Sequence, residues 1–130
     1  MYFYGGDVKL NPDLSYSRDH LWISFTDDIA IIGLMQESVD AAQEIVFIDL
    51  PQLHSVINSG ERLLSVESLK SSLHLPSPVS GEVVEVNDAV FDEPNILNAN
   101  AYNTFICKMR VIKKGDVLSA EEAKTYYENK

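Results

Sequence analysis

Residues 62–87 read RLLSVESLKSSLHLPSPVSGEVVEVN, and they hold the clearest structural pattern in the chain. The runs 62–67 and 73–78 place leucine and valine among polar residues, which is typical of short strands. Small polar residues surround Lys70 between these two runs. We therefore expect Lys70 at or near the tip of a hairpin, with its amine accessible.

A third strand-like run follows at residues 79–87. Its valines are interspersed with Glu82 and Glu85, so we expect the two carboxylates to face solvent. Gly81 stands near the start of this run, eleven residues after Lys70. We interpret it as part of a tight turn leading into the strand, because glycine adopts backbone conformations that β-branched residues resist.

Lys70 is isolated among acidic residues. No other lysine lies between Lys9 and Lys108, and residues 19–107 contain fourteen acidic residues but only two basic ones. An exposed lysine in a hairpin usually serves only solubility. Here its isolation, its turn position and its flanking residues favour a site of chemical modification.

The rest of the chain is also mainly β in pattern. Many short strands predict a small sandwich or barrel with a few helical turns, formed as a single domain over residues 1–130. The last helix should begin at Ser119, because Glu122 follows at the spacing of a capping box. The expected segments are an irregular lead-in (1–15), a hairpin (20–25 and 28–34), helical turns (38–44), a strand (44–50), a loop (92–101), a strand (104–112) and a C-terminal helix (119–129).

Composition excludes several classes of protein. The chain has 130 residues, of which 45% are hydrophobic, and this suits a packed domain rather than a disordered chain. A net charge of −10 argues against binding to nucleic acid or to an anionic membrane. There is no apolar run of transmembrane length and no secretion signal, and Cys107 is the single cysteine. We expect a cytoplasmic protein without disulfides.

Familiar catalytic patterns are missing from the sequence. His20, His54 and His74 lack the spacings of zinc sites, so no metal site is predicted. Neither a Gly-rich phosphate loop nor a nucleophile elbow is found. Cys107 lies among apolar residues in a predicted strand, which favours a core thiol over a nucleophile. The sequence does not predict an enzyme.

Five segments in order resemble the glycine cleavage system H protein family. Residues 67–71, ESLKS, are similar to the family's lipoyl-lysine motif E-S-V-K-A, and residues 78–87 are similar to its P-V-S-G-E-V-V-E-V-N. Residues 31–34 resemble V-G-I-T, residues 46–51 resemble V-F-V-D-L-P, and residues 94–102 resemble P-x-L-[IVL]-N…P-Y. Biotin carriers and the lipoyl domains of 2-oxoacid dehydrogenases usually have other residues beside the target lysine. The resemblance runs from about residue 16 to the closing helix.

This resemblance implies a mainly β barrel-sandwich hybrid of the lipoyl/biotinyl-carrier type, with a short internal helix and a C-terminal helix. It implies covalent lipoate on Lys70, with Glu67 and Gly81 contributing to recognition by the modifying enzyme. The lipoyl arm of such a carrier shuttles an aminomethyl group in glycine catabolism, and the protein itself catalyses nothing. The implied partners are glycine decarboxylase, aminomethyltransferase, dihydrolipoyl dehydrogenase, and a lipoate ligase or lipoyl/octanoyl transferase.

Three departures from the family pattern bear on function. The family's H-E-W is His20-Leu21-Trp22 here, the acid four residues after its lysine is His74, and its G-x-G-W-[LMI] appears as residues 103–106. These changes weaken the aminomethyl role more than the carrier role. Two alternatives stay open: an H-like lipoyl relay serving protein lipoylation or redox signalling, and a carrier-fold interaction protein that is never lipoylated.

Overall fold

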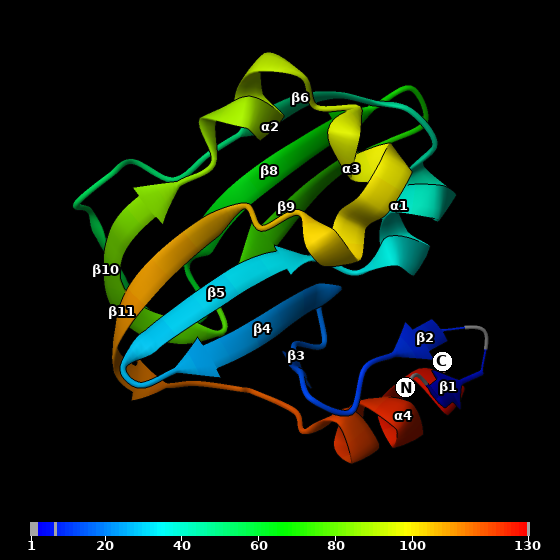
Figure 1. Cartoon of the computed structure of the whole chain (residues 1–130), viewed down its shortest axis with the longest axis horizontal. Coiled ribbons are helices and arrows are strands. Elements are labelled where there is room, and N and C mark those ends of the chain that lie inside the picture. The colour runs from blue at the N-terminus through cyan, green and yellow to red at the C-terminus, as the bar shows by residue number, and fades with distance from the viewer. Residues whose placement is uncertain (1–2, 7, 130) are drawn as a thin grey trace.

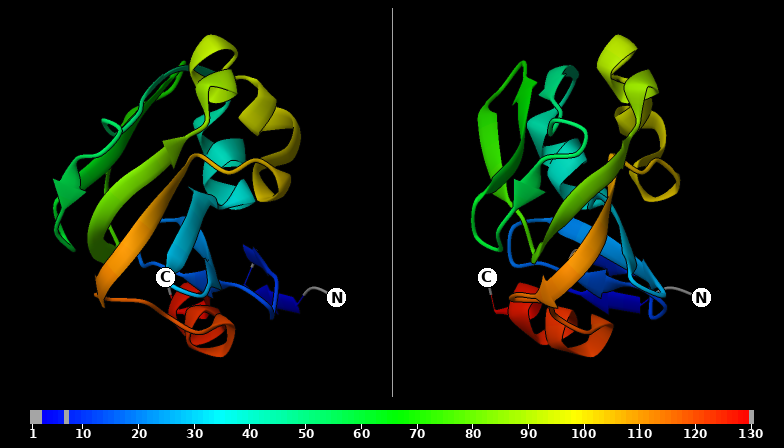
Figure 2. Two further views of the ribbon diagram at one scale, coloured as in Figure 1. Left: turned by 60° about the vertical axis from the view of Figure 1, so that its left-hand side comes forward. Right: turned by 90° about the vertical axis from the view of Figure 1, so that its left-hand side faces the viewer.

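Two antiparallel β-sheets face one another in the computed structural model, which describes residues 3–6 and 8–129 (Figures 1 and 2). One sheet has the strand order β3-β4-β5-β11-β10-β7, the other has the order β6-β8-β9, and β1 pairs with β2. The fold is the mainly β barrel-sandwich type that the resemblance implied, with a short internal helix and a C-terminal helix.

The strands are β1 (Phe3–Gly5), β2 (Val8–Leu10), β3 (Ser15–Tyr16), β4 (Leu21–Thr26), β5 (Ile29–Leu34), β6 (Ile45–Asp49), β7 (Val56–Ile57), β8 (Arg62–Ser68), β9 (Ser72–Pro76), β10 (Val79–Val86) and β11 (Cys107–Lys114). The helices are α1 (Gln36–Ala42), α2 (Asp88–Asp92), α3 (Ile96–Asn100), the 3-10 turn η1 (Ala101–Asn103) and α4 (Ala120–Glu128).

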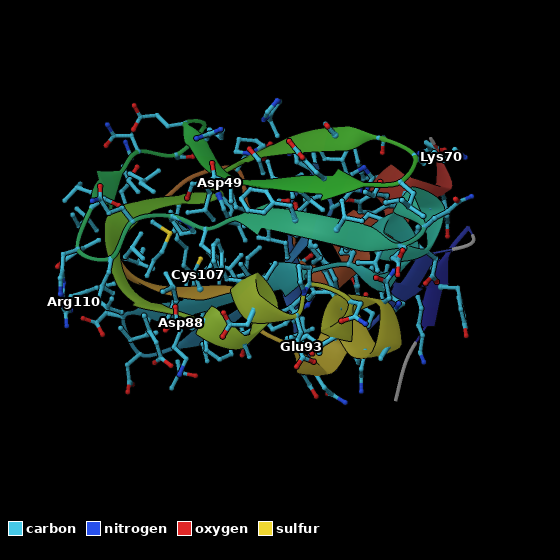
Figure 3. The ribbon with its side chains drawn as sticks, turned by 90° about the horizontal axis from the view of Figure 1, so that it is seen from above. Asp49, Lys70, Asp88, Glu93, Cys107 and Arg110 are labelled. Carbon is cyan, nitrogen blue, oxygen red and sulfur yellow. The ribbon has the colours of Figure 1, made fainter. Side chains whose placement is uncertain are left out.

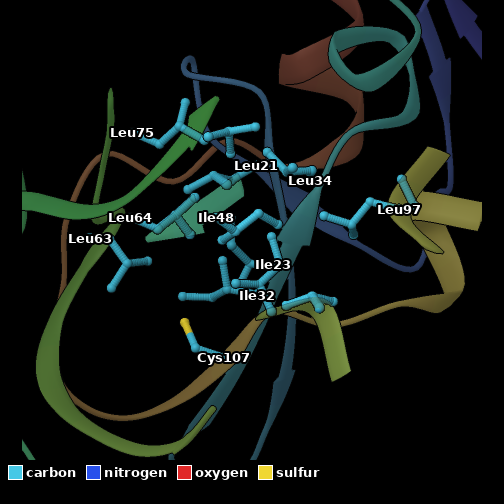
Figure 4. Close-up of a cluster of buried hydrophobic side chains, with 14 of the residues drawn as sticks. Leu21, Ile23, Ile32, Leu34, Ile48, Leu63, Leu64, Leu75, Leu97 and Cys107 are labelled. Carbon is cyan, nitrogen blue, oxygen red and sulfur yellow. The ribbon is translucent and has the colours of Figure 1, made fainter. Parts of the chain in front are cut away.

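The main core lies between the two sheets. Strands from both sheets send apolar residues inward, and twenty buried side chains of the described residues form one cluster, part of which Figure 4 shows. Ile23, Ile32 and Ile48 are fully buried there, and Cys107 lies beside them. Burial on this scale, at about 25 cal/mol per Å² of apolar surface, is what holds the sheets together.

A second core joins the two ends of the chain. α4 packs against β1 and β2 at one end of the molecule (Figure 1). The Ser119 side chain accepts a hydrogen bond from the Glu122 backbone N–H (3.1 Å), and the Glu122 carboxylate accepts one from the Ser119 N–H (2.9 Å). The predicted capping box and helix are therefore confirmed.

Two segments differ from their sequence-based predictions. The lead-in 1–15 was expected to be irregular, yet β1 and β2 form a hairpin in it; residues 1, 2 and 7 lie outside the described part. The segment 92–101 was expected to be a loop, yet it holds the end of α2 and all of α3. In both places tertiary packing overrides weak local propensity: Leu10 is buried under α4, and Leu97 is buried in the main core.

Candidate functional site

Lys70 lies at the tip of the β8–β9 hairpin, as the sequence predicted, at one end of the molecule (Figure 3). The Ser68 side chain organises the turn: its Oγ accepts hydrogen bonds from the backbone N–H groups of Lys70 (3.3 Å) and Ser71 (3.0 Å) and donates one to the Ser71 carbonyl (3.0 Å). Leu69 N–H also donates to the carbonyl of Glu44, 3.0 Å away, just before β6. Serine is suited to this position because its hydroxyl replaces backbone partners in tight turns.

The Lys70 side chain is exposed and available. Leu69 and Ser71 on either side of it are exposed as well. Within residues 3–6 and 8–129, no carboxylate lies within ion-pair distance of the Lys70 ammonium group. A single accessible amine on a held turn is suitable for acylation by an enzyme.

A groove of about 390 Å³ begins beside Lys70. This volume falls within the range of about 300–1,000 Å³ that is usual for clefts that hold small ligands. Helix α1 forms one wall and the start of β9 forms the other. The lining combines apolar and polar groups, among them Ala41, Ala42, Leu73, Ser38, His20 and Glu37.

His20 and Glu37 pair with each other in the groove, although they lie 17 residues apart in the sequence. His20 Nδ1 lies 2.7 Å from the Glu37 carboxylate, and both side chains are only about a quarter exposed, at 28% and 25%. His20 has a left-handed backbone (φ 71°), and its N–H donates to the hydroxyl of Tyr127 (3.2 Å) while its carbonyl accepts from Met35 N–H (2.8 Å). These bonds hold the histidine in an uncommon conformation for a non-glycine residue.

Glu37 was missed by the sequence analysis. It stands in the first turn of α1, where an acid favours the helix N-terminus, and that local role gave no reason to single it out. Its pairing with His20 joins residues 17 apart and depends on how α1 packs beside the start of β4. Local spacing carries no signal for such a contact.

The structure shows what replaces the two acids of the family pattern. Leu21 is fully buried in the main core, and its side chain has no polar group to offer the groove. His74 is exposed on the outer face of the three-stranded sheet, where its Nδ1 lies 2.9 Å from Ser65 Oγ. Neither residue offers a carboxylate, so Glu37 is the one acidic residue that lines the groove beside Lys70 among the described residues.

The two other residues proposed for recognition lie in different places. Glu67 is exposed on β8, three residues before Lys70 and paired with Phe47 of β6 and Ser72 of β9. Gly81 is buried within β10, where it pairs with Val111 and Ile57.

The prediction that Gly81 belongs to a tight turn is wrong. Its backbone is part of an extended strand, and it is not among the glycines with positive φ. A Cβ at this position would lie 2.2 Å from the Arg110 carbonyl oxygen, so glycine is needed for the close approach of β10 to β11. Arg110 lies at the end of the molecule opposite Lys70 (Figure 3), which gives Gly81 a structural role remote from the lysine.

The remaining candidates for chemistry have structural environments. Cys107 is fully buried, and burial raises the pKa of its thiol to about 12, which fits the predicted core thiol. Trp22 is buried against Gly33 and donates its indole N–H to the Ala101 carbonyl (3.1 Å). His54 is exposed and lies 3.4 Å from the Glu82 carboxylate. No group of three or more potential metal ligands, and no helix long and apolar enough to cross a membrane, is found among the residues that the structure describes.

Comparisons with known proteins agree on one family. The sequence model of the glycine cleavage H-protein family matches residues 14–130. Glycine cleavage system H protein 1 of Caldanaerobacter subterraneus subsp. tengcongensis is 34% identical over 124 residues, covering 93% of this chain and 99% of the relative. The H protein of Clostridioides difficile is 38% identical over 105 residues, covering 80% of this chain and 84% of the relative.

A solved structure gives the same answer for the fold. The crystal structure of a glycine cleavage system H protein from Mycobacterium marinum superposes with a TM-score of 0.82 at 31% identity, covering 87% of this chain and 94% of that chain. Members of this family are non-catalytic carrier components, which agrees with the lack of catalytic patterns in the sequence. The chain belongs to the glycine cleavage H-protein family.

Proposed function

We propose that this protein carries lipoate as an amide on Lys70 and shuttles an aminomethyl group between the enzymes of glycine cleavage. The observation that carries the proposal is the exposed Lys70 on a turn held by Ser68, in a member of the H-protein family. Lipoate, when bound, supplies a disulfide that can accept a carbon group and return as a dithiol. The groove beside Lys70 is large enough for an arm of this kind and has an apolar wall for it.

The carrier role rests on the rigid body beneath the arm. The hairpin tip is anchored by backbone hydrogen bonds to Ser71 and Glu44, while Lys70, which would carry the arm, is exposed. Tethering keeps the reactive end at high effective concentration near each enzyme that docks. The proposed partners are glycine decarboxylase, aminomethyltransferase, dihydrolipoyl dehydrogenase, and a lipoate ligase or lipoyl/octanoyl transferase, all in the cytoplasm.

The amide on Lys70 is tested by intact mass. Protein expressed in cells that make lipoate should show one lipoyl adduct, and Lys70→Arg should show none while melting at the wild-type temperature. Lys9→Arg is the matched control and should keep the adduct, because Lys9 lies in β2 near α4. An adduct on another lysine, or no adduct at all, would contradict the proposal.

Glu37 has a role in this proposal. A cationic amine entering the groove meets this carboxylate, since positions 21 and 74 supply none. The lipoylated protein is incubated with glycine decarboxylase and glycine, and the mass of the aminomethyl adduct is followed. We expect Glu37→Gln to lower the yield roughly five- to tenfold, in line with about 1–1.5 kcal/mol for the net contribution of one hydrogen bond in a partly exposed groove, without changing lipoylation.

Asp40→Asn is the control for this experiment, because Asp40 lies on α1 but is exposed, does not line the groove, and accepts a side-chain hydrogen bond from Gln36. Equal yields in the two variants would remove Glu37 from the proposal. Failure of wild-type lipoyl protein to form any aminomethyl adduct would favour the alternative function, a lipoyl relay.

A further inference from the structure

Two exposed phenylalanines, one on β6 and one on α2, lie side by side. Phe47 of β6 is 41% exposed, Phe91 of α2 is 52% exposed, and their rings meet edge to face with centroids 5.9 Å apart. We call Phe47 and Phe91 the aromatic patch. Large apolar side chains that gather on a surface typically mark a site of protein contact.

The aromatic patch is continuous with the Lys70 hairpin through the sheet. Phe47 is the cross-strand partner of Glu67, and Glu67 is the partner of Ser72, so these three residues form one row over the outer face of β6, β8 and β9. Lys70 follows Glu67 by three residues, a span of at most about 10 Å. A protein contact of ordinary size covers roughly 800 Å² on each partner and is about 30 Å across. A protein that encloses the Lys70 amine therefore reaches Phe47 at the edge of an ordinary contact, and Phe91 lies next to Phe47.

Unpaired carboxylates surround the patch. Asp88, Asp92 and Glu93 are exposed on or beside α2, and Glu44 and Glu67 are exposed next to β6. In the described part of the chain none of these five forms an ion pair, whereas Asp49 on the same face pairs with Arg62. An apolar centre with a negative rim is complementary to an apolar pocket edged by lysine or arginine.

The chemistry at Lys70 points to one occupant. The enzymes that use the finished carrier act at the end of a long arm, but the enzyme that attaches lipoate acts on the Lys70 amine itself. Lys70 Nζ must reach an activated lipoyl carbonyl inside that enzyme; the amide bond forms, the activating group leaves with its electron pair, and the amine loses a proton. This enzyme approaches the hairpin most closely.

We propose that the aromatic patch is the docking surface for the enzyme that lipoylates Lys70, and that this enzyme meets Phe47 and Phe91 with an apolar pocket edged by basic side chains. The inference rests on the proposed function, because it requires Lys70 to be the lipoylated residue. The two rings meet edge to face and remain about half exposed, so both keep accessible apolar surface for a partner. Buried aromatic side chains are typical contributors of most of the energy of such contacts.

The test measures transfer to the unmodified protein. Purified lipoate ligase, ATP and lipoate are incubated with increasing carrier, and lipoylation is followed by intact mass. We expect Phe47→Thr and Phe91→Gln each to lower kcat/KM about tenfold, mainly through KM, and Phe47→Leu to lose less. Ile112→Thr is the matched control, since Ile112 is 74% exposed on β11, two residues after Arg110 at the far end (Figure 3).

The possible outcomes separate a failure of the docking surface from a failure of the proposed function. Wild-type rates in both phenylalanine variants, or equal slowing in Ile112→Thr, would overturn the docking surface while leaving lipoylation of Lys70 intact. A dimer of wild type that dissociates in Phe91→Gln, seen by sedimentation, would also overturn it by assigning the patch to a second copy. No labelling of Lys70 in wild type would instead contradict the proposed function. Melting temperatures within a few degrees of wild type ensure that slower transfer reports docking.

Discussion

The two ends of the molecule are built on opposite principles. At the Lys70 end, residues 69–72 are all exposed and the turn depends on a few hydrogen bonds around Ser68. At the other end, β10 and β11 approach so closely that a Cβ at Gly81 would lie 2.2 Å from the Arg110 carbonyl oxygen. Just beyond these strands, a Cβ at Gly115 would lie 2.8 Å from the Pro78 carbonyl oxygen. The contrast shows how a carrier combines rigidity with access: dense packing fixes the body, and the reactive group stands on an exposed turn.

The strongest test of this contrast places the same side chain, valine, at both ends. Gly81→Val should lower the free energy of unfolding by about 3 kcal/mol or more, because the Arg110 carbonyl belongs to the backbone and cannot move aside. Ser71→Val at the exposed tip should change it by about 0.5 kcal/mol or less. Urea unfolding measures both.

Similar stabilities of the two variants would show that β10 and β11 can separate without cost. The lipoylation of Gly81→Val is informative only at a temperature where the variant is folded. At such a temperature we expect Gly81→Val to be lipoylated at nearly the wild-type rate, because Gly81 lies far from Lys70. A folded variant that is not lipoylated would restore a recognition role to Gly81.

The next test concerns the interior between the two ends. Burial raises the pKa of Cys107 to about 12 from 9.0, so the folded state holds the thiol proton more tightly than the unfolded state does. The Cys107 thiol makes its full contribution to the free energy of unfolding below pH 9, and this contribution is lost as the pH rises from 9 to about 12. Relative to Cys107→Val, the free energy of unfolding of wild type should fall by up to about 1.4 kcal/mol per pH unit in that window.

The free energies of unfolding of the two proteins, measured at pH 8, 9, 10 and 11, give this difference. The effects of titratable groups that both proteins share cancel when one value is subtracted from the other. Parallel stability curves would mean that the thiol reaches water in the folded state. In that case the interior would be more open than its fully buried residues indicate.

The sequence could predict those parts of the molecule that depend on interactions between residues close together in the chain. The hairpins 20–34 and 62–76, the strand 45–49 and the capped helix α4 were predicted, because period-two patterns, turn residues and caps lie within short segments. Lys70 was predicted for the same reason. The residues around it that depend on other elements were not predicted.

Three misses share that physical cause. The Glu37–His20 pair requires α1 to pack beside the start of β4, and the aromatic patch requires α2 to lie beside β6. Gly81 was assigned to a turn because glycine often marks one, whereas the clash that requires it comes from a strand nearly 30 residues away. Contacts between elements distant in the sequence leave no periodic trace.

The smallest expected effect is at the lysine tip itself. Ser68→Ala removes the hydroxyl that accepts from the N–H groups of Lys70 and Ser71 and donates to the Ser71 carbonyl. The turn keeps its backbone bond from Ser68 N–H to the Ser71 carbonyl (2.9 Å), so the hairpin should still form. We expect a loss of about 1 kcal/mol or less in global stability, because the freed groups are exposed and water can replace the serine.

The local effect should be clearer than the global one. Hydrogen exchange at residues 70 and 71 should become about fivefold faster in Ser68→Ala, while the exchange of buried Val66 stays the same. Ser72→Ala is the control, since Ser72 is exposed beside the turn and its side chain does not bond to it. Equal exchange in the two variants would show that the backbone bonds alone order the tip. Faster exchange only in Ser68→Ala would show that one side chain holds the lysine in place, and that the open end of the molecule is ordered locally rather than by the packing that fixes the other end.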